Sequence, residues 1–137
     1  MNCEKLRDFL NDNDLFCRHC NIRLTHVAPG EAAAELEITS DSMNSRNVVQ
    51  GGAIMTLADF AFAGAANACG HTTVSTGVTT HFLRPGVGKK LFAKAKALHH
   101  GRTTCLYQVD VTDEHDKLVA SVSISGFTVS TEPVIED

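Results

Sequence analysis

The chain has 137 residues, of which 43% are hydrophobic and 20% are charged, and its formal net charge is −4. This composition is ordinary for a folded protein and excludes a disordered chain, a collagen-like rod and a repeat array. The acidic balance argues against nucleic acid as a partner. Acidic residues within the first 14 positions, and the lack of an 18-residue apolar run, predict a cytoplasmic protein that does not associate with membranes. The length predicts one domain over residues 1–137.

The pattern along the chain predicts an N-terminal helical segment, two strands, one long helix and four further strands. The segment at about residues 3–20 favours one or two short helices, interrupted by turn-forming residues at 11–14. Residues 51–68 are rich in Ala, Leu, Met and Phe and predict the long helix. The stretches typical of strands are residues 22–27, 33–39, 73–83, 91–99, 103–112 and 118–129. Short turns join the last four stretches, which favours antiparallel pairing.

One carboxylate interrupts the long apolar helix. Between Asn47 and Phe82, Asp59 is the only formally charged side chain. A carboxylate among apolar residues is destabilising unless it is paired, hydrogen-bonded or open to a wet cleft. Asp59 also lies two turns into the helix, too far to act as its cap. It is therefore either a structural carboxylate on a narrow exposed stripe or a general base or nucleophile in a pocket; we favour the second.

Two glycines precede the apolar run, in the sequence Gln50-Gly51-Gly52. Glycines allow an acyl group to approach the backbone closely, and the first helical turn carries unpaired N–H donors that suit a developing oxyanion. A simple helix-entry turn is the alternative interpretation. If a pocket lies here, we expect the helix to line it with Met55, Phe60 and Phe62.

Half of the twelve Lys and Arg residues fall between residues 84 and 102, and no Asp or Glu occurs between Phe60 and Val109. This segment is either a solvated strand with its turns or a site for a phosphorylated ligand. The five cysteines are an odd number, which predicts free thiols. Cys17 and Cys20 have a spacing that zinc favours, but no second ligand pair follows them. We therefore expect no metal and retain zinc binding only as a minor alternative.

Several short motifs together carry a family likeness. They are Met43-Asn44, Gln50-Gly51-Gly52, Leu57-Ala58-Asp59, Phe82-Leu83-Arg84-Pro85 and Gly101-Arg102. This combination resembles the hotdog-fold acyl-CoA thioesterases, and more narrowly the PaaI branch linked to phenylacetate degradation, over residues 22–129. The resemblance implies an α+β hotdog fold, in which an antiparallel sheet wraps around one long central helix. It also implies hydrolysis of an aryl- or medium-chain acyl-CoA to the free acid and CoA, without a metal or redox cofactor.

The resemblance also implies roles for individual residues. Asp59 matches the general base or nucleophile, the backbone N–H of Gly52 matches the group that polarises the thioester carbonyl, and Asn44 matches the residue that places the water or acyl group. Gln50 and Gly51 complete the catalytic set. The expected substrate and CoA contacts are Ser75, Phe82, Arg84, Lys89, Lys90 and Arg102. Active sites in this family form between subunits, so we expect a homodimer or a homotetramer built as a dimer of dimers.

One position departs from the family pattern, because Gln50 stands where the family has histidine before the two glycines. Glutamine offers a donor and an acceptor but cannot gain a proton near neutral pH. Two alternatives therefore stay open beside the thioesterase. One is a non-catalytic acyl-CoA-binding protein on the same scaffold. The other is a hydratase or dehydratase of acyl thioesters, which the missing histidine disfavours.

Overall fold

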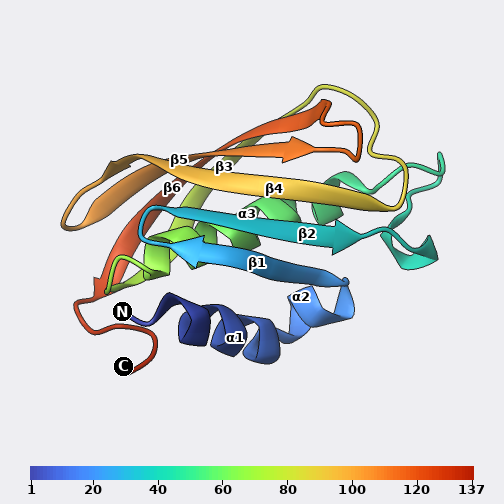
Figure 1. The fold of residues 1–137 in the computed structure, drawn as a ribbon. Coiled ribbons are helices and arrows are strands. Elements are labelled where there is room, and N and C mark those ends of the chain that lie inside the picture. Colours follow the sequence, from blue (N-terminus) through green and yellow to red (C-terminus); the bar gives the residue numbers. More distant parts are fainter.

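The computed structural model describes residues 1–137 and consists of one six-stranded sheet, a central helix and an N-terminal helical segment (Figure 1). The helices are α1 (Cys3–Asn13), α2 (Leu15–His19), the 3-10 turn η1 (Ser40–Ser42) and α3 (Gly51–Asn67). The strands are β1 (Ile22–Ala28), β2 (Glu31–Glu37), β3 (Thr72–Phe82), β4 (Lys90–His100), β5 (Thr104–Thr112) and β6 (Leu118–Ser130). Every neighbouring pair is antiparallel, in the order β1-β2-β4-β5-β6-β3.

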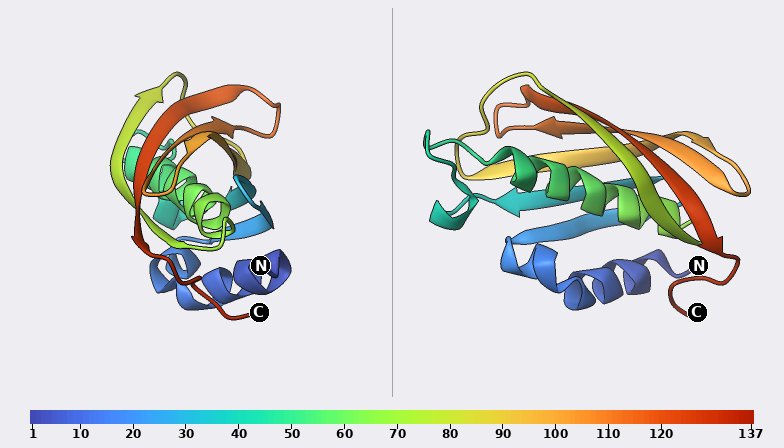
Figure 2. Two further views of the ribbon diagram at one scale, coloured as in Figure 1. Left: turned by 90° about the vertical axis from the view of Figure 1, so that its left-hand side faces the viewer. Right: turned by 180° about the vertical axis from the view of Figure 1, so that it is seen from behind.

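The sheet curls around α3, which Figure 2 shows along and across the helix. This arrangement confirms the α+β hotdog fold that the motifs implied. The helix has 17 residues and ends close to Gly70, whose φ of +97° suits a glycine. Gly64 lets α3 approach β1 closely, because a Cβ there would lie 3.0 Å from Leu24 and 3.1 Å from Val27. No helix in the structure combines the length and apolar character needed to cross a membrane.

The hydrophobic core fills the space between α3 and the concave face of the sheet. Alternate residues of β5 are buried there, which is the face that the sequence alternation indicated. The ring of Phe62 on α3 packs edge-on against the ring of Tyr107, with centroids 5.2 Å apart. Each of the six strands lies within two residues of its predicted range. The expected break over residues 11–14 was too wide, since α1 continues to Asn13 and only Asp14 interrupts the helical segment.

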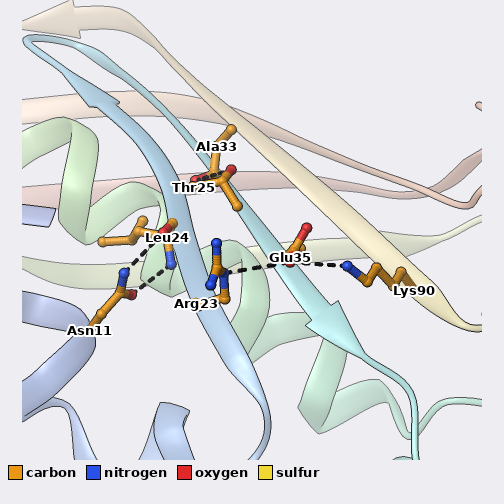
Figure 3. A network of polar contacts seen from close by, with 7 residues as sticks. All are labelled: Asn11, Arg23, Leu24, Thr25, Ala33, Glu35 and Lys90. Atoms are coloured by element: carbon orange, nitrogen blue, oxygen red, sulfur yellow. Dashed lines mark hydrogen bonds and ion pairs between the residues drawn. The ribbon is translucent and has the colours of Figure 1, made fainter. Parts of the chain in front are cut away.

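The two edges of the sheet are treated differently. At the β1 edge, the Asn11 side chain on α1 pairs with the backbone of Leu24. Its Nδ2 donates to the Leu24 carbonyl at 2.9 Å, and its Oδ1 accepts from the Leu24 N–H at 2.7 Å (Figure 3). β3 forms the opposite edge and pairs only with β6. An open edge strand presents unpaired backbone groups to other chains. The covered β1 edge therefore leaves β3 as the free edge.

Ion pairs join three strands on the outer face of the sheet (Figure 3). The Glu35 carboxylate on β2 lies 3.5 Å from Arg23 Nε on β1 and 3.2 Å from Lys90 Nζ on β4. The ammonium group of Lys90 is thus directed along the outer surface of the sheet, away from α3. Exposed pairs of this kind contribute little to stability.

Removing the Asn11 side chain tests the β1 edge. We expect Asn11→Ala to lower the free energy of unfolding by about 1–3 kcal/mol, because the Leu24 N–H and carbonyl both lose their partner in a partly buried position. Asn11→Asp keeps the acceptor but not the donor and should fall between Asn11→Ala and the wild type. Urea denaturation measures the change. Asn13→Ala, which removes only one local bond to the Phe9 carbonyl on exposed α1, is the control; an equal loss in both alanine variants would contradict the edge role.

Candidate active site

One stripe of α3 is not covered by the sheet and faces a cavity of about 430 Å³. Gly52, Thr56, Asp59 and Ala63 follow each other at helical spacing along this stripe, with Met55 and Phe60 beside them. The expected cavity lining is therefore right for Met55 and Phe60. It was wrong for Phe62, which does not line the cavity and packs against Tyr107 of β5.

The opposite wall of the cavity comes from β3 and α2. Ser75 and Val78 of β3 both face the cavity although they are three residues apart, a spacing that would put them on opposite faces of a regular strand. The register of β3 against β6 slips between Ser75 and Gly77, so one extra residue restores both side chains to the same face. α2 and its cap add Asp14, Phe16 and Cys17.

The Asp59 carboxylate lies in this cavity without hydrogen bonds to both of its oxygens. Its Oδ1 is buried and has no hydrogen-bond partner. Burial raises the pKa of Asp59 above its ordinary value, the nearby Ser75 side chain acts in the opposite direction, and the Asp14 carboxylate raises it further. A partly desolvated carboxylate of this kind has a stronger tendency to take a proton than an exposed one, which suits a general base.

The Gly52 N–H, which lines the same cavity, is already engaged in the structure. Gln50 is the N-cap of α3, and its side-chain Oε1 accepts from the Gly52 N–H. The N–H groups of Ala53 and Ile54 both donate to the Gln50 carbonyl, at 2.9 and 3.2 Å. The first turn of α3 is therefore organised around Gln50.

Several other motif residues surround a second cavity at the N-terminal end of α3, also about 430 Å³. Asn44, Gly51, Phe82 and Arg84 line it, and Asp59 does not. The Asn44 Oδ1 accepts from the N–H groups of Arg46 at 2.9 Å and Val48 at 3.4 Å. Within one chain, the structure thus separates the predicted residues into an Asp59 group and an Asn44 group.

The predicted basic contacts lie at two ends of β4. Lys90 begins the strand and Lys89 precedes it, and their backbone N–H groups both donate to Glu114 Oε1. Arg102 follows the other end, beyond ten strand steps that span about 33 Å. Neither Lys89, Lys90 nor Arg102 lines either cavity. Only Arg84 reaches the second cavity.

The cysteines form no metal centre with neighbouring groups. All five thiols are free, as their odd number predicted. No cluster of three or more His, Cys, Asp or Glu side chains could hold a metal ion. Burial raises the pKa of Cys17 well above its usual range, with Asp14, Cys20 and Asp59 adding to the effect. Cys17 is therefore a neutral wall of the cavity and not a reactive thiolate.

Sequence reasoning missed the N-terminal contribution to the cavity. The sequence gives no sign that Asp14, Phe16 and Cys17 reach this cavity, because their position beside α3 depends on how α1 and α2 pack on β1. Val78 was missed because the slip in β3 register leaves no sequence signal. Thr56 could have been found, since it lies three residues before Asp59 on the same helical face.

Comparisons with known proteins identify relatives by sequence and by fold. The sequence pattern of the thioesterase superfamily matches residues 46–120. Acyl-coenzyme A thioesterase PaaI of Escherichia coli is 33% identical over 110 residues, which cover 80% of this chain and 79% of that protein. The structure of the PaaI protein from the E. coli phenylacetic acid degradation operon matches with a TM-score of 0.90 at 27% identity, covering 95% of each chain. The TT0310 protein of Thermus thermophilus matches with a TM-score of 0.80 at 34% identity, over 85% of this chain and 99% of that one.

A helix wrapped by an antiparallel sheet, with a carboxylate in a cavity on its uncovered stripe, defines the chain as a hotdog-fold protein. The chain belongs to the thioesterase superfamily. More narrowly it is a PaaI-like thioesterase, an enzyme that hydrolyses a thioester bond. This membership favours the enzyme over the non-catalytic binding protein and the hydratase.

Because Asp59 is partly buried, replacing it with a neutral side chain should stabilise the fold. We expect Asp59→Asn to raise the free energy of unfolding at pH 7–8 by about 1–3 kcal/mol. The variant carries a neutral amide where the wild type buries a charged carboxylate whose Oδ1 has no hydrogen-bond partner. The folded-state pKa is raised, so the destabilisation of the wild type develops as the pH rises through the unfolded carboxyl pKa towards the folded one. The two proteins should therefore converge below about pH 4.

Urea denaturation at several pH values measures this difference. Asp110→Asn is the matched control, since Asp110 is an exposed aspartate on β5. A wild type that stays more stable than Asp59→Asn across the whole range would show that the carboxylate is stabilised by its surroundings.

Proposed function

We propose that the protein hydrolyses an acyl-CoA thioester to the free acid and CoA, with Asp59 as the catalytic carboxylate and the Gly52 N–H as the oxyanion donor. The observation that carries this proposal is the buried Asp59 Oδ1, which has no partner within the chain and lies on the wall of a cavity. The name of the E. coli relative, an acyl-coenzyme A thioesterase, supports the substrate class.

The chemistry needs few groups. In one route a water molecule attacks the thioester carbon and passes its proton to Asp59; in the other, Asp59 attacks the carbon and water then hydrolyses the resulting anhydride. Both routes place negative charge on the carbonyl oxygen, and a backbone N–H at a helix N-terminus stabilises that charge. When the C–S bond breaks, CoA leaves as a thiolate, which then takes up a proton. The acyl group is released as the acid in that step of the first route, and on hydrolysis of the anhydride in the second.

The spacing on α3 supports a site shared between two copies of the chain. The backbone positions of Gly52 and Asp59 are seven residues apart, about 10 Å along the helix axis. The Asp59 side chain leans towards the helix N-terminus and shortens part of this separation. For direct attack, the carboxylate oxygen and the donor nitrogen must lie within about 7 Å, counting the approach to carbon, the C=O bond and the hydrogen bond. Within one chain this leaves little room to spare, and pairing Asp59 of one copy with Gly52 of another relaxes the requirement.

The free edge of β3 supports the way two copies would meet. β3 has no partner on its outer side, and its apolar side chains Val74, Val78 and Phe82 are 44%, 42% and 53% exposed. Pairing of two β3 strands would cover them and would bring the cavity walls at Ser75 and Val78 beside a second chain. We propose a homodimer formed in this way, which can pair further into a homotetramer.

The walls of the Asp59 cavity support an aryl or medium-chain acyl group. Phe16, Met55, Phe60 and Val78 supply apolar surface in a space of about 430 Å³, which is within the range of small-molecule sites. A role in phenylacetate degradation follows if the acyl group is aryl, and the operon named for the E. coli structure supports it. The second cavity, with Asn44 and Arg84, is then the approach for the CoA chain.

The basic residues fit this arrangement unequally. Arg84 lines the second cavity, and Lys89 lies in the loop that follows it, so both can meet a CoA phosphate from the same chain. Lys90 is engaged with Glu35 and has to exchange that pair for a phosphate. Arg102, at the far end of β4, can contribute only from a different copy.

Substitution of Asp59 tests the catalytic role. We expect Asp59→Asn to lower thiol release from the best acyl-CoA substrate by about 10²–10⁴-fold, because asparagine can neither accept the proton nor attack. A thiol-release screen over aryl, short-chain and medium-chain acyl-CoAs identifies that substrate first. Asp110→Asn should keep the wild-type rate. Wild-type turnover in Asp59→Asn would remove Asp59 from the mechanism.

A mixed dimer tests the shared site. Gly52→Pro removes the N–H together with its bond to Gln50, and proline is tolerated in a first helical turn. The variant should lower kcat by about 10²–10³-fold, whereas Gly52→Ala keeps the N–H. Differently tagged Asp59→Asn and Gly52→Pro chains are co-expressed and the mixed dimers are isolated. A shared site predicts about half of the wild-type activity, because one of the two sites combines an intact Asp59 with an intact Gly52. No activity in folded mixed dimers would show that both groups act within one chain.

A further inference from the structure

The side chain of Gln50 occupies the hydrogen bond that a substrate carbonyl would need. Its Oε1 accepts from the Gly52 N–H, and a Cβ built on Gly52 would lie 3.1 Å from the same oxygen. Gly52 is the glycine that lines the Asp59 cavity, whereas Gly51 lines the other one. The amide oxygen of Gln50 therefore accepts from the donor assigned to the oxyanion, on a residue that lines the Asp59 cavity.

In this contact the Gln50 side-chain amide takes the place of the substrate carbonyl. A side-chain amide and a thioester both present a neutral carbonyl oxygen, so they compete for one N–H donor. An oxyanion forms a charge-assisted hydrogen bond that is about twice as strong as a neutral one, so it competes far better than either carbonyl. The Gln50 side chain is also exposed, so water can take over its hydrogen bonds when it moves away.

We propose that Gln50 is a positioning residue that caps the oxyanion donor of the resting enzyme and must swing away for the thioester to be hydrolysed. The inference rests on the proposed function, because it assigns Gly52 as the oxyanion donor. Its consequence is that the same hydrogen bond stabilises α3 as an N-cap and opposes catalysis. Stability and activity should then respond to substitutions of Gln50 in opposite directions.

Two variants of Gln50 change its hydrogen bond to the Gly52 N–H in opposite directions: one removes it and the other strengthens it. Gln50→Ala removes the capping oxygen, so the melting temperature should fall while kcat/KM rises about two- to tenfold, the range for one neutral hydrogen bond. Gln50→Glu has the same shape but places a carboxylate on the N–H at the positive end of the helix dipole. Its melting temperature should rise and its kcat/KM should fall at least tenfold at pH 8.

The pH dependence of kcat/KM in Gln50→Glu distinguishes a Gln50 that blocks the oxyanion donor from one that only caps the helix. The ratio of kcat/KM for Gln50→Glu to that for the wild type should increase as the pH falls through the pKa of the new carboxyl, because the protonated acid is a neutral acceptor like glutamine. A helix cap with no part in gating predicts that activity follows stability: lower in Gln50→Ala and unchanged or higher in Gln50→Glu. That outcome would overturn the proposal.

Amide hydrogen exchange provides a readout that needs no turnover. By NMR, the Gly52 N–H should exchange more slowly in the wild type than in Gln50→Ala, while the Ala53 N–H, which donates to the Gln50 backbone carbonyl, should change little. Equal exchange of Gly52 in both proteins would show that the cap is not populated. A capped Gly52 in a protein whose Gly52→Pro variant retains full turnover would instead remove Gly52 from the mechanism, and with it the gating role.

Discussion

The structure depends on one unfavourable placement, a carboxylate in the middle of an apolar helix. Most other residues of α3 are buried because the sheet curls around the helix, and that burial stabilises the fold. Asp59 escapes full burial only because one stripe of the helix is left uncovered by the sheet. The cavity over this stripe is completed by residues of α2 and by β3, where the register slip brings Ser75 and Val78 to the same wall.

Strand β3 connects the Asp59 cavity to the edge of the sheet. β3 carries Ser75 and Val78 over the cavity and is also the strand without an outer partner. At the other edge, the Asn11 side chain binds the backbone of Leu24 and closes β1. A second chain that joins β3 would therefore complete the sheet and the cavity in one step. Within a single chain, the cavity that contains Asp59 and Gly52 is separate from the cavity that contains Asn44 and Arg84.

Much of the fold and part of the site could be predicted from the sequence. The strands and α3 are regular elements whose alternation and composition are local properties, and Asp59 is conspicuous because no other charge occurs nearby. Gln50 and Gly52 were found through their motif, but the hydrogen bond between them depends on a side-chain rotamer. The cavity walls at Phe16 and Val78 depend on tertiary packing and on a bulge. Phe62 was misassigned because a helix that is apolar on nearly every side does not reveal which side faces the cavity.

The pH dependence of kcat/KM in the wild-type enzyme tests the central claim most directly. If Asp59 in its desolvated cavity is the base or nucleophile, kcat/KM should rise with pH through a pKa above that of an ordinary aspartate, since the free enzyme must be ionised at this group. The residual activity of Asp59→Asn should lack that rise. A profile that is flat from pH 4 to 8 in the wild type, or one whose acidic limb persists in Asp59→Asn, would contradict the account.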